Sequence, residues 1–368
     1  MNRLIALIAL LVAGTIVHAE DAPIVGAIRW DAWSGGEITQ EVERSLGPKK
    51  YHTRLPWFAD VIDEKTVRID GSPQEVMDRE IAWAAEAGLD YWAFLTYSTE
   101  SSLSAALNQY LSSSKRDQIG FSLILHNTLT VPEGQWKQER DRALQLLREP
   151  GYQTVLGGRP LVYSLTGEDF PVERFRDFLN KARKQGHQPY CVFMGWHPAA
   201  DIKKSKPWGF DAVSSYAKPG NQPDFSDLVK VTEKDCWANA VYGQAPYIPI
   251  LTTGWDKAPR QENPVSWERG SDYHSQKVFP SRATPDEIAS HLGSALAFVR
   301  KHTDLCEAQA VIIYAWNEYD EGGWLAPTRS PDGTPDTSRL EAIKRVLTTD
   351  RNTQRDGGAQ PVTRSGSK

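Results

Sequence analysis

Eight short apolar segments recur along the chain, and none of them alternates strictly between hydrophobic and polar positions. Nearly continuous apolar runs are typical of strands that are buried on both faces, as in a parallel sheet. The eight predicted strands span residues 25–30, 91–97, 121–126, 160–164, 190–196, 210–216, 247–252 and 310–316.

Segments with helical periodicity separate these predicted strands. The clearest spans residues 73–87, carries acidic residues in its first turn and stops at Gly88. Strand and helix alternate along the chain without a change of composition that would mark a linker. The pattern therefore predicts an α/β fold with a single (β/α)8 TIM barrel. The other predicted helices cover residues 101–113, 135–148, 172–185, 226–241 and 285–301.

The two ends of the chain differ from this barrel region. Residues 1–19 combine a short basic start, an apolar run and small residues before Ala19, which is the pattern of a secretory signal peptide. The apolar run is shorter than the roughly 20 residues of a membrane span, so an anchor is the weaker alternative. We expect a secreted or periplasmic protein, a barrel over residues 20–349 and a disordered polar tail over 350–368.

Composition excludes several classes of function. The formal net charge is −5, and acidic and basic residues are interspersed, so the sequence lacks the basic stripe that a nucleic acid requires. Cys191, Cys236 and Cys306 lack the spacing of a zinc site, and they allow at most one disulfide. The sequence contains no HExxH, GxSxG, P-loop or GxGxxG element. We expect neither a cofactor nor a metal.

Aromatic and polar side chains gather just past the predicted strands, where the loops of a barrel build the active site. Rings alternating with carboxylates, imidazoles and amides suit a carbohydrate, which has an apolar face and a rim of hydroxyls. For His126 and His197, the alternative is a hydrogen bond that holds a strand end. The predicted carbohydrate-binding residues are Trp30, Asp31, Trp33, Tyr97, His126, Asn127, Trp196, His197, Tyr216, Trp255, Asp256, Asn317 and Tyr319.

Three acids follow the last predicted strand within four residues: Glu318, Asp320 and Glu321. In a helical turn, Glu318 and Glu321 would have their Cβ atoms roughly 5–6 Å apart, close to the separation of about 5–5.5 Å between the carboxyl groups of a retaining glycosidase. Mutual repulsion would raise the proton affinity of one carboxyl and so provide an acid and a base together. The alternative is a solvated acidic loop at the start of a helix.

The stretch 314–325 (YAWNEYDEGGWL) resembles the last-strand signature of the family 99-like glycoside hydrolases, the group around the endo-α-mannosidases. Segments 26–36 (GAIRWDAWSGG) and 247–260 (YIPILTTGWDKAPR) resemble two further motifs of that group in the same order. The likeness therefore spans nearly the whole chain that would remain after signal cleavage.

This resemblance implies roles for individual residues. Glu318 would be the base that removes the proton from the substrate's 2-hydroxyl, which then attacks the anomeric carbon. Glu321 would be the acid that protonates the leaving oxygen. Asp320 departs from the family pattern, which has a histidine there, so a specificity for mannose does not follow. Asn317 and Tyr319 would flank the pair, and Trp255 with Asp256 would face it.

Two loops, residues 31–72 after the first strand and 254–283 after the seventh, are too long to be simple connections. They carry Arg54 and Arg260. Either arginine could bind an acidic sugar or a sulfate through paired hydrogen bonds, or could pin its loop to an internal carboxylate.

The sequence thus predicts an exported glycoside hydrolase that cleaves a poly- or oligosaccharide through a glutamate pair and retains the anomeric configuration by participation of the 2-hydroxyl. A glycosyltransferase and a non-catalytic polysaccharide-binding barrel are the alternatives. The signal peptide argues against the first, because nucleotide-sugar donors are cytoplasmic. The presence of both glutamates argues against the second.

We expect the exported protein to begin at Glu20, because the small residues before that position fit a signal peptidase. N-terminal sequencing of the protein purified from its native cells measures this directly. An intact N-terminus would contradict the assignment.

Overall fold

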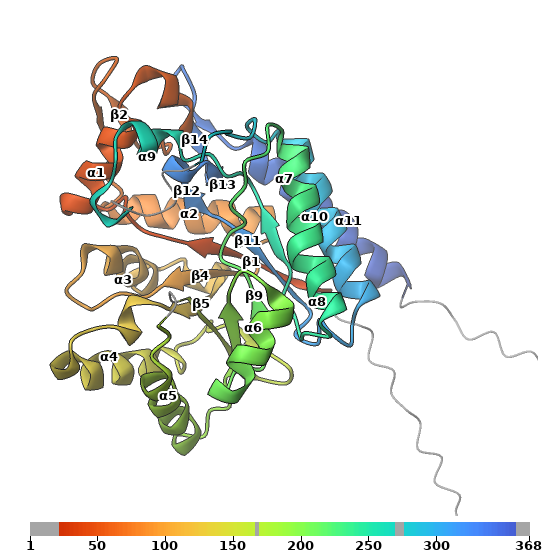
Figure 1. Cartoon of the computed structure of the whole chain (residues 1–368). Helices are drawn as coiled ribbons and strands as arrows, with labels where there is room; N and C mark the ends of the chain where they lie inside the picture. The colour runs from red at the N-terminus through yellow and green to blue at the C-terminus, as the bar shows by residue number, and fades with distance from the viewer. Residues whose placement is uncertain (1–21, 166–168, 269–275, 358–368) are drawn as a thin grey trace, which may run out of the picture.

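The computed structural model describes residues 22–165, 169–268 and 276–357. The predicted signal peptide and most of the predicted tail lie outside these residues. Within them, a ring of parallel strands is surrounded by helices (Figure 1). This arrangement confirms the predicted single (β/α)8 barrel.

Each of the eight predicted apolar runs overlaps one barrel strand. Consecutive strands pair in parallel, and the last one, β11, pairs with both β1 and β10. Between β9 and β10, the amide of Val213 donates to the carbonyl of Pro246 at 2.9 Å, and the amide of Ile248 donates to the carbonyl of Val213 at 3.0 Å. These two bonds close the ring. The strands are β1 (Ile24–Arg29), β4 (Tyr91–Leu95), β5 (Gly120–Leu125), β7 (Arg159–Ser164), β8 (Tyr190–Met194), β9 (Ala212–Ser214), β10 (Ile250–Thr252) and β11 (Ala310–Tyr314).

The helices pack on the outside of this ring (Figure 1). The predicted helix 226–241 is one continuous run in which a π-helical segment, Glu233–Ala238, separates α7 from α8. The helix α10 begins with a capping box between Thr284 and Glu287. The helices of the ring are α2 (Gln74–Ala87), α3 (Ala105–Ser112), α4 (Glu133–Leu146), α5 (Val172–Lys184), α6 (Pro198–Ser205), α7 (Phe225–Thr232), α8 (Asn239–Tyr242), α10 (Pro285–Lys301) and α11 (Ser338–Gly357).

The last helix, α11, runs past residue 349, where the sequence pattern places the start of the tail. Asp350 forms an ion pair with Arg300, and Arg351 forms one with Asp90 at 2.9 Å. Charged contacts therefore stabilise this end of the helix, and hydrophobic periodicity could not reveal them. The predicted boundary is corrected to Gly357, and residues 358–368 lie outside the described ones.

The two long loops contain regular structure of their own. The loop after β1 forms α1 (Gly36–Leu46), a 3-10 turn and a hairpin of β2 (Asp60–Val61) with β3 (Val67–Arg68). The loop after β10 forms α9 (Ala258–Glu262), and residues 269–275 of it are outside the described part. Short strands also occur elsewhere: β6 (Thr154–Val155), β12 (Asn317–Glu318), β13 (Gly323–Trp324), β14 (Thr328–Arg329) and β15 (Pro335–Asp336).

A buried polar network ties β1 to α2 and to the segment after β11. Arg29 donates to Glu80 at 2.6 Å and to Asp31 at 3.1 Å. The indole of Trp316 donates to the same Glu80 oxygen at 3.1 Å. All four side chains are buried, so each charge depends on its partner to offset the cost of leaving water.

Among the described helices, none combines the length and the apolar character that crossing a bilayer requires. Cys191, Cys236 and Cys306 are all buried, and none of them is in a disulfide.

We expect Glu80→Ala to lower the free energy of unfolding by about 3–5 kcal/mol, because it leaves the buried Arg29 without a main partner. Glu86→Ala, on the same helix, is the matched control. Its ion pair with Lys344 is exposed and should contribute less than about 1 kcal/mol. Denaturant unfolding compares the two, and equal losses would contradict the structural role of Glu80.

Candidate active site

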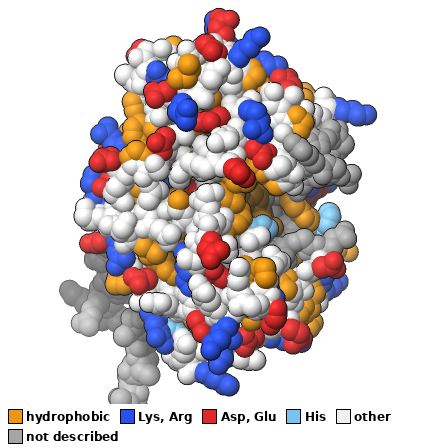
Figure 2. Space-filling view, turned by 90° about the vertical axis from the view of Figure 1, so that its left-hand side faces the viewer, with side chains coloured by type: hydrophobic (Ala, Val, Ile, Leu, Met, Phe, Trp, Pro, Cys, Tyr) orange, Lys and Arg blue, Asp and Glu red, His pale blue; other side chains and the backbone are white. Residues whose placement is uncertain are grey.

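A cavity of about 500 Å³ opens at the carboxyl ends of the barrel strands, and Figure 2 shows the hollow with hydrophobic side chains inside it. It contains both predicted catalytic glutamates. The predicted residues that line it are Trp30, Tyr97, His126, Asn127, Trp196, Tyr216, Trp255, Glu318 and Glu321. The remaining lining residues are Ile38, Leu95, Leu103, Leu165, Ala217, Lys257, Arg260, Trp267 and Glu268.

Four of the predicted binding residues do not line the cavity but contact one another and the residues that do. Asn317 accepts a hydrogen bond from the amide of Trp30 at 3.0 Å and donates to Asp31 at 3.4 Å. Trp33 and Tyr319 are both buried and pack edge to face with 5.0 Å between their ring centroids. These contacts hold the backbone that carries Trp30 and Glu318.

Asp256 and His197 also lie away from the cavity lining. The carboxylate of Asp256 forms an ion pair with Arg54 and accepts from the amide of Ala258 at 2.9 Å. Arg54 additionally donates to the carbonyl of Asp256 at 3.0 Å, so it pins the loop after β10. His197 is the N-cap residue of α6, and its amide donates to Asp201 at 2.6 Å.

Two glycines allow the loops after β10 and β11 to meet backbone to backbone. Gly254 has φ +144°, and a Cβ there would lie 2.0 Å from the carbonyl oxygen of Gly322. Gly322 has φ +82°, and its Cβ would lie 2.6 Å from the amide nitrogen of Asp256. The close approach lets that amide donate to the carbonyl of Glu321 at 2.6 Å. Glu321 is thereby fixed beside the loop that carries Lys257 and Arg260.

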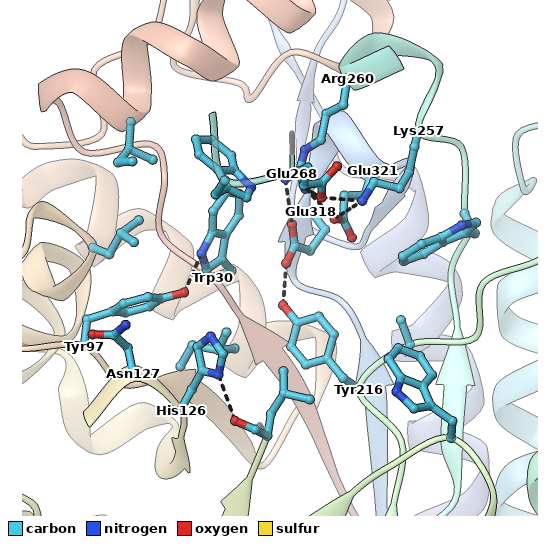
Figure 3. Close-up of a pocket in the computed structure, with 18 residues that line it drawn as sticks. Trp30, Tyr97, His126, Asn127, Tyr216, Lys257, Arg260, Glu268, Glu318 and Glu321 are labelled. Carbon is cyan, nitrogen blue, oxygen red and sulfur yellow. Dashed lines mark hydrogen bonds and ion pairs between the residues drawn. The ribbon is translucent and has the colours of Figure 1, made fainter. Parts of the chain in front are cut away.

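Arg260 is the centre of a buried ion-pair cluster (Figure 3). It binds Asp320 in two-pronged fashion, with Nε–Oδ2 at 2.6 Å and Nη2–Oδ1 at 3.0 Å. Its Nη1 donates to Glu268 Oε1 at 2.7 Å and also to Glu321 Oε1. Lys257 Nζ donates to the same Glu268 oxygen and lies 3.1 Å from Glu321 Oε1. Arg260 therefore serves internal carboxylates, the second of the two roles open to it from the sequence.

Both carboxylate oxygens of Glu321 accept hydrogen bonds from neighbouring side chains. Oε1 faces Lys257 and Arg260, and Oε2 accepts from the phenol of Tyr314. Burial by itself would raise the pKa of Glu321, but the two cations and the phenol outweigh it, so the pKa lies below its usual range.

Glu318 has a poorer set of partners. Tyr216 donates to its Oε1 (Figure 3). Its Oε2 is buried and has no hydrogen bond from a residue that the structure describes, and the nearest cationic nitrogen of those residues, Arg260 Nη2, is 3.7 Å away. Burial and the negative charge of Glu321 raise the pKa of Glu318 well above its usual value, against the opposing effect of Arg260. The surrounding side chains thus favour a proton on Glu318 and a negative charge on Glu321.

Tyr97, His126 and Asn127 form the wall across the cavity from the glutamates (Figure 3). Four aliphatic side chains also line the cavity: Ile38, Leu95, Leu103 and Leu165. Trp30 Nε1 donates to Tyr97 at 2.9 Å, which leaves the phenol hydrogen free to donate elsewhere. His126 Nδ1 bonds the carbonyl of Leu165 at 2.8 Å, and burial lowers its pKa, so it is a neutral imidazole with Nε2 as the acceptor. This wall can bind a molecule that has both hydroxyls and an apolar face.

The site has no unopposed positive charge among the described residues. Lys257 and Arg260 are the cations that line the cavity, and each contacts at least two carboxylates. An anionic ligand would therefore have to compete with carboxylates that these two cations already bind. The described residues contain no group of three or more His, Cys, Asp or Glu side chains that could hold a metal ion.

Sequence reasoning left out Lys257, Trp267 and Glu268 as site residues. Lys257 directly follows Trp255 and Asp256 at a strand end, so the same positional signal was available for it. Glu268 lies at the end of a short turn within the long loop, and only the folded chain brings it to Lys257.

Comparisons with known proteins support the fold. No family model matches the sequence, and no curated protein matches it either. Two solved structures of a GH99 endo-α-mannosidase from Bacteroides thetaiotaomicron are similar to this chain. The first has a TM-score of 0.54 and 11% identity over 89% of this chain and 97% of its own. The second, in complex with bis-tris propane, has a TM-score of 0.51 and 9% identity over 90% and 98%. The resemblance noted in the sequence is thus confirmed at the level of the fold.

We expect Trp33→Ala to lower the free energy of unfolding by about 3–5 kcal/mol, because its ring is 2% exposed and packs against Trp30 and Tyr319. Trp196 lines the mouth and is 39% exposed, so Trp196→Ala should change stability by less than about 0.5 kcal/mol. Denaturant unfolding measures both. A large loss in the Trp196 variant would place that ring in the core.

Proposed function

We propose that this protein is an exported glycoside hydrolase that cleaves a glycosidic bond of a poly- or oligosaccharide with the pair Glu318 and Glu321. The observation that carries the proposal is that two buried carboxyl groups share one cavity and are driven toward opposite charge states. Glycoside hydrolysis needs one carboxyl to protonate the leaving oxygen and another that is ionised. Export rests on the signal-peptide pattern of residues 1–19.

Retention of the anomeric configuration is part of the proposal. Glu318 and Glu321 lie at the two ends of a single tight turn, with Tyr319–Glu321 in a 3-10 helix. Positions three apart on such a turn bring their side chains to one face, which supports the short carboxyl separation of retaining enzymes. A water molecule between the two groups, as inversion requires, would need a wider gap.

The proposed substrate is a neutral carbohydrate. Trp30, Trp196, Trp255 and Trp267 offer rings against which the apolar face of a sugar can stack. Tyr97, His126 and Asn127 offer a donor, an acceptor and an amide for hydroxyl groups. Uronic acids and sulfated sugars are disfavoured, because the two cations of the described lining, Lys257 and Arg260, are already paired with carboxylates. A mannose specificity is not proposed.

Two routes lead to retention, and they differ in which glutamate holds the proton. In the route that the family resemblance implies, Glu318 is ionised and activates the 2-hydroxyl, while Glu321 is the acid. In the other route, an ionised carboxylate attacks the anomeric carbon directly and the second carboxyl is the acid. Both routes use the same pair, so the proposed function does not depend on the choice.

A barrel that only binds polysaccharide would have no need for two carboxyls in opposite charge states. Burying them costs free energy that a binding surface can avoid. The charge states therefore favour an enzyme over the binding protein.

We expect Glu318→Gln and Glu321→Gln each to lower kcat/KM by about 10²- to 10⁴-fold, because each keeps the side chain's size and removes a proton-transfer or charge function. Neutral α-linked oligosaccharides are the first substrates to test. Activity of the wild-type protein should follow a broad bell-shaped pH profile. The acid limb lies low, because the pKa of Glu321 is lowered, and the alkaline limb lies high, because that of Glu318 is raised.

Glu86→Gln is the control for this prediction, since Glu86 is a surface residue and its variant should retain wild-type rates. Wild-type rates in both active-site variants would contradict the proposed function.

A further inference from the structure

We propose that in this chain Glu318 is the proton donor and that Glu321 stays ionised, held by a clamp that consists of Lys257, Arg260 and Tyr314. The inference rests on the proposed glycoside hydrolase function and assigns the two glutamates roles opposite to those that the family resemblance implies. Lys257 is a positioning residue in this scheme, because it acts on the reaction through Glu321.

The contacts of Glu321 disfavour a proton on either of its carboxylate oxygens. Lys257 and Arg260 are donors only, so a proton on Oε1 would point at two other donors. A proton on Oε2 would compete with the hydrogen that Tyr314 donates to that atom. Glu321 is also only 7% exposed, so these fixed partners replace water in stabilising its negative charge.

The contacts of Glu318 have the opposite effect. An ionised carboxylate accepts several hydrogen bonds. Among the described residues, Glu318 receives one, from Tyr216, and its Oε2 is buried without a partner. Leaving a buried charged oxygen unsatisfied costs free energy. A neutral Glu318 avoids that cost, and it lines the cavity where a leaving oxygen would lie.

The charges around each carboxyl agree with this assignment. Glu318 faces one cation, Arg260, two carboxylates, Asp320 and Glu321, and the phenols of Tyr97, Tyr216 and Tyr314. The one cation of this set makes no hydrogen bond to it.

Lys257 and Arg260 are cations that contact Glu321 directly. Their positive charges offset the effect on Glu321 of the nearby carboxyl groups of Glu268 and Glu318 and of the phenols of Tyr216 and Tyr314. Arg260 also bonds Asp320 through its other nitrogens, so Lys257 supplies the second cation that Glu321 requires.

The reaction that follows from this assignment has two steps. First, Glu318 gives its proton to the glycosidic oxygen as the bond from that oxygen to the anomeric carbon breaks, and a carboxylate oxygen of Glu321 bonds to that carbon. Second, ionised Glu318 takes a proton from water, the water oxygen bonds to the anomeric carbon, and the ester to Glu321 breaks. The net reaction is hydrolysis with retention, and both glutamates return to their starting states.

Carboxyl-carbon NMR of the full-length mature protein, labelled with ¹³C at the glutamate side-chain carboxyls, tests the assignment without a substrate. The resonances lost in Glu318→Gln and in Glu321→Gln identify the two groups. We expect Glu318 to titrate well above a free glutamate and Glu321 below it. Glu321 titrating at the same pH as Glu318, or above it, would overturn the inference. Each variant by itself identifies the resonance of the residue that it replaces, and so gives the pH at which that residue titrates in the wild-type protein.

The clamp has a separate test. Lys257→Met should raise the pH at which Glu321 titrates, whereas Lys257→Arg, which keeps the charge, should shift it less. Lys344→Met removes a surface lysine that pairs with Glu86 and is the control that should shift nothing. An unchanged titration of Glu321 in a folded Lys257→Met variant would show that Lys257 does not hold the carboxylate.

Kinetics give the roles a readout of their own. On the glycosyl fluoride of a neutral sugar that the wild-type protein hydrolyses, the leaving group needs no proton. In kcat/KM, which reports the step in which the leaving group departs, Glu318→Gln should then recover most of the loss of about 10²- to 10⁴-fold seen with the natural leaving group, while Glu321→Gln should recover little. The reverse pattern would overturn the inference. If no carbohydrate is hydrolysed, the proposed function fails, and the NMR titration still decides where the proton lies.

Discussion

The burial of one guanidinium group among carboxylates is the constraint on which the rest of the site depends. Arg260 is 2% exposed and contacts Asp320, Glu268 and Glu321 at once. Removing one partner of such a cluster leaves a buried charge uncompensated, which typically costs several kcal/mol. The positions of these four side chains are therefore mutually dependent, and the charge of Glu321 follows from the cations that the cluster brings to it.

Asp320 has its explanation in this cluster. It is fully buried, and both of its oxygens accept hydrogen bonds from Arg260. It therefore orients the guanidinium, whose remaining nitrogen, Nη1, reaches Glu268 and Glu321. The glycines Gly254 and Gly322 bring the two loops that carry Arg260 and Asp320 into backbone contact.

The sequence predicted the frame of this site better than its details, for identifiable reasons. Hydrophobic runs determine strands directly, so the barrel and the carboxyl ends of its strands followed from them. The direction of each side chain did not follow. Arg29 and Asp31 bond to each other on one side of the chain, while Trp30 between them faces the cavity, as successive side chains along an extended segment do. Lys257 and Glu268 become neighbours only through loop folding, and the preferred site of the proton depends on charges that several loops contribute.

The central claim is that Glu318 and Glu321 act in succession on one anomeric carbon, from the two faces of the bond that breaks. The anomeric configuration of the first product, recorded by proton NMR before mutarotation, tests it most directly. A product with the configuration of the substrate is expected, since two displacements restore it. A product with inverted configuration would contradict the account, because it requires a single displacement by water across a wider carboxyl separation of about 6.5–9.5 Å.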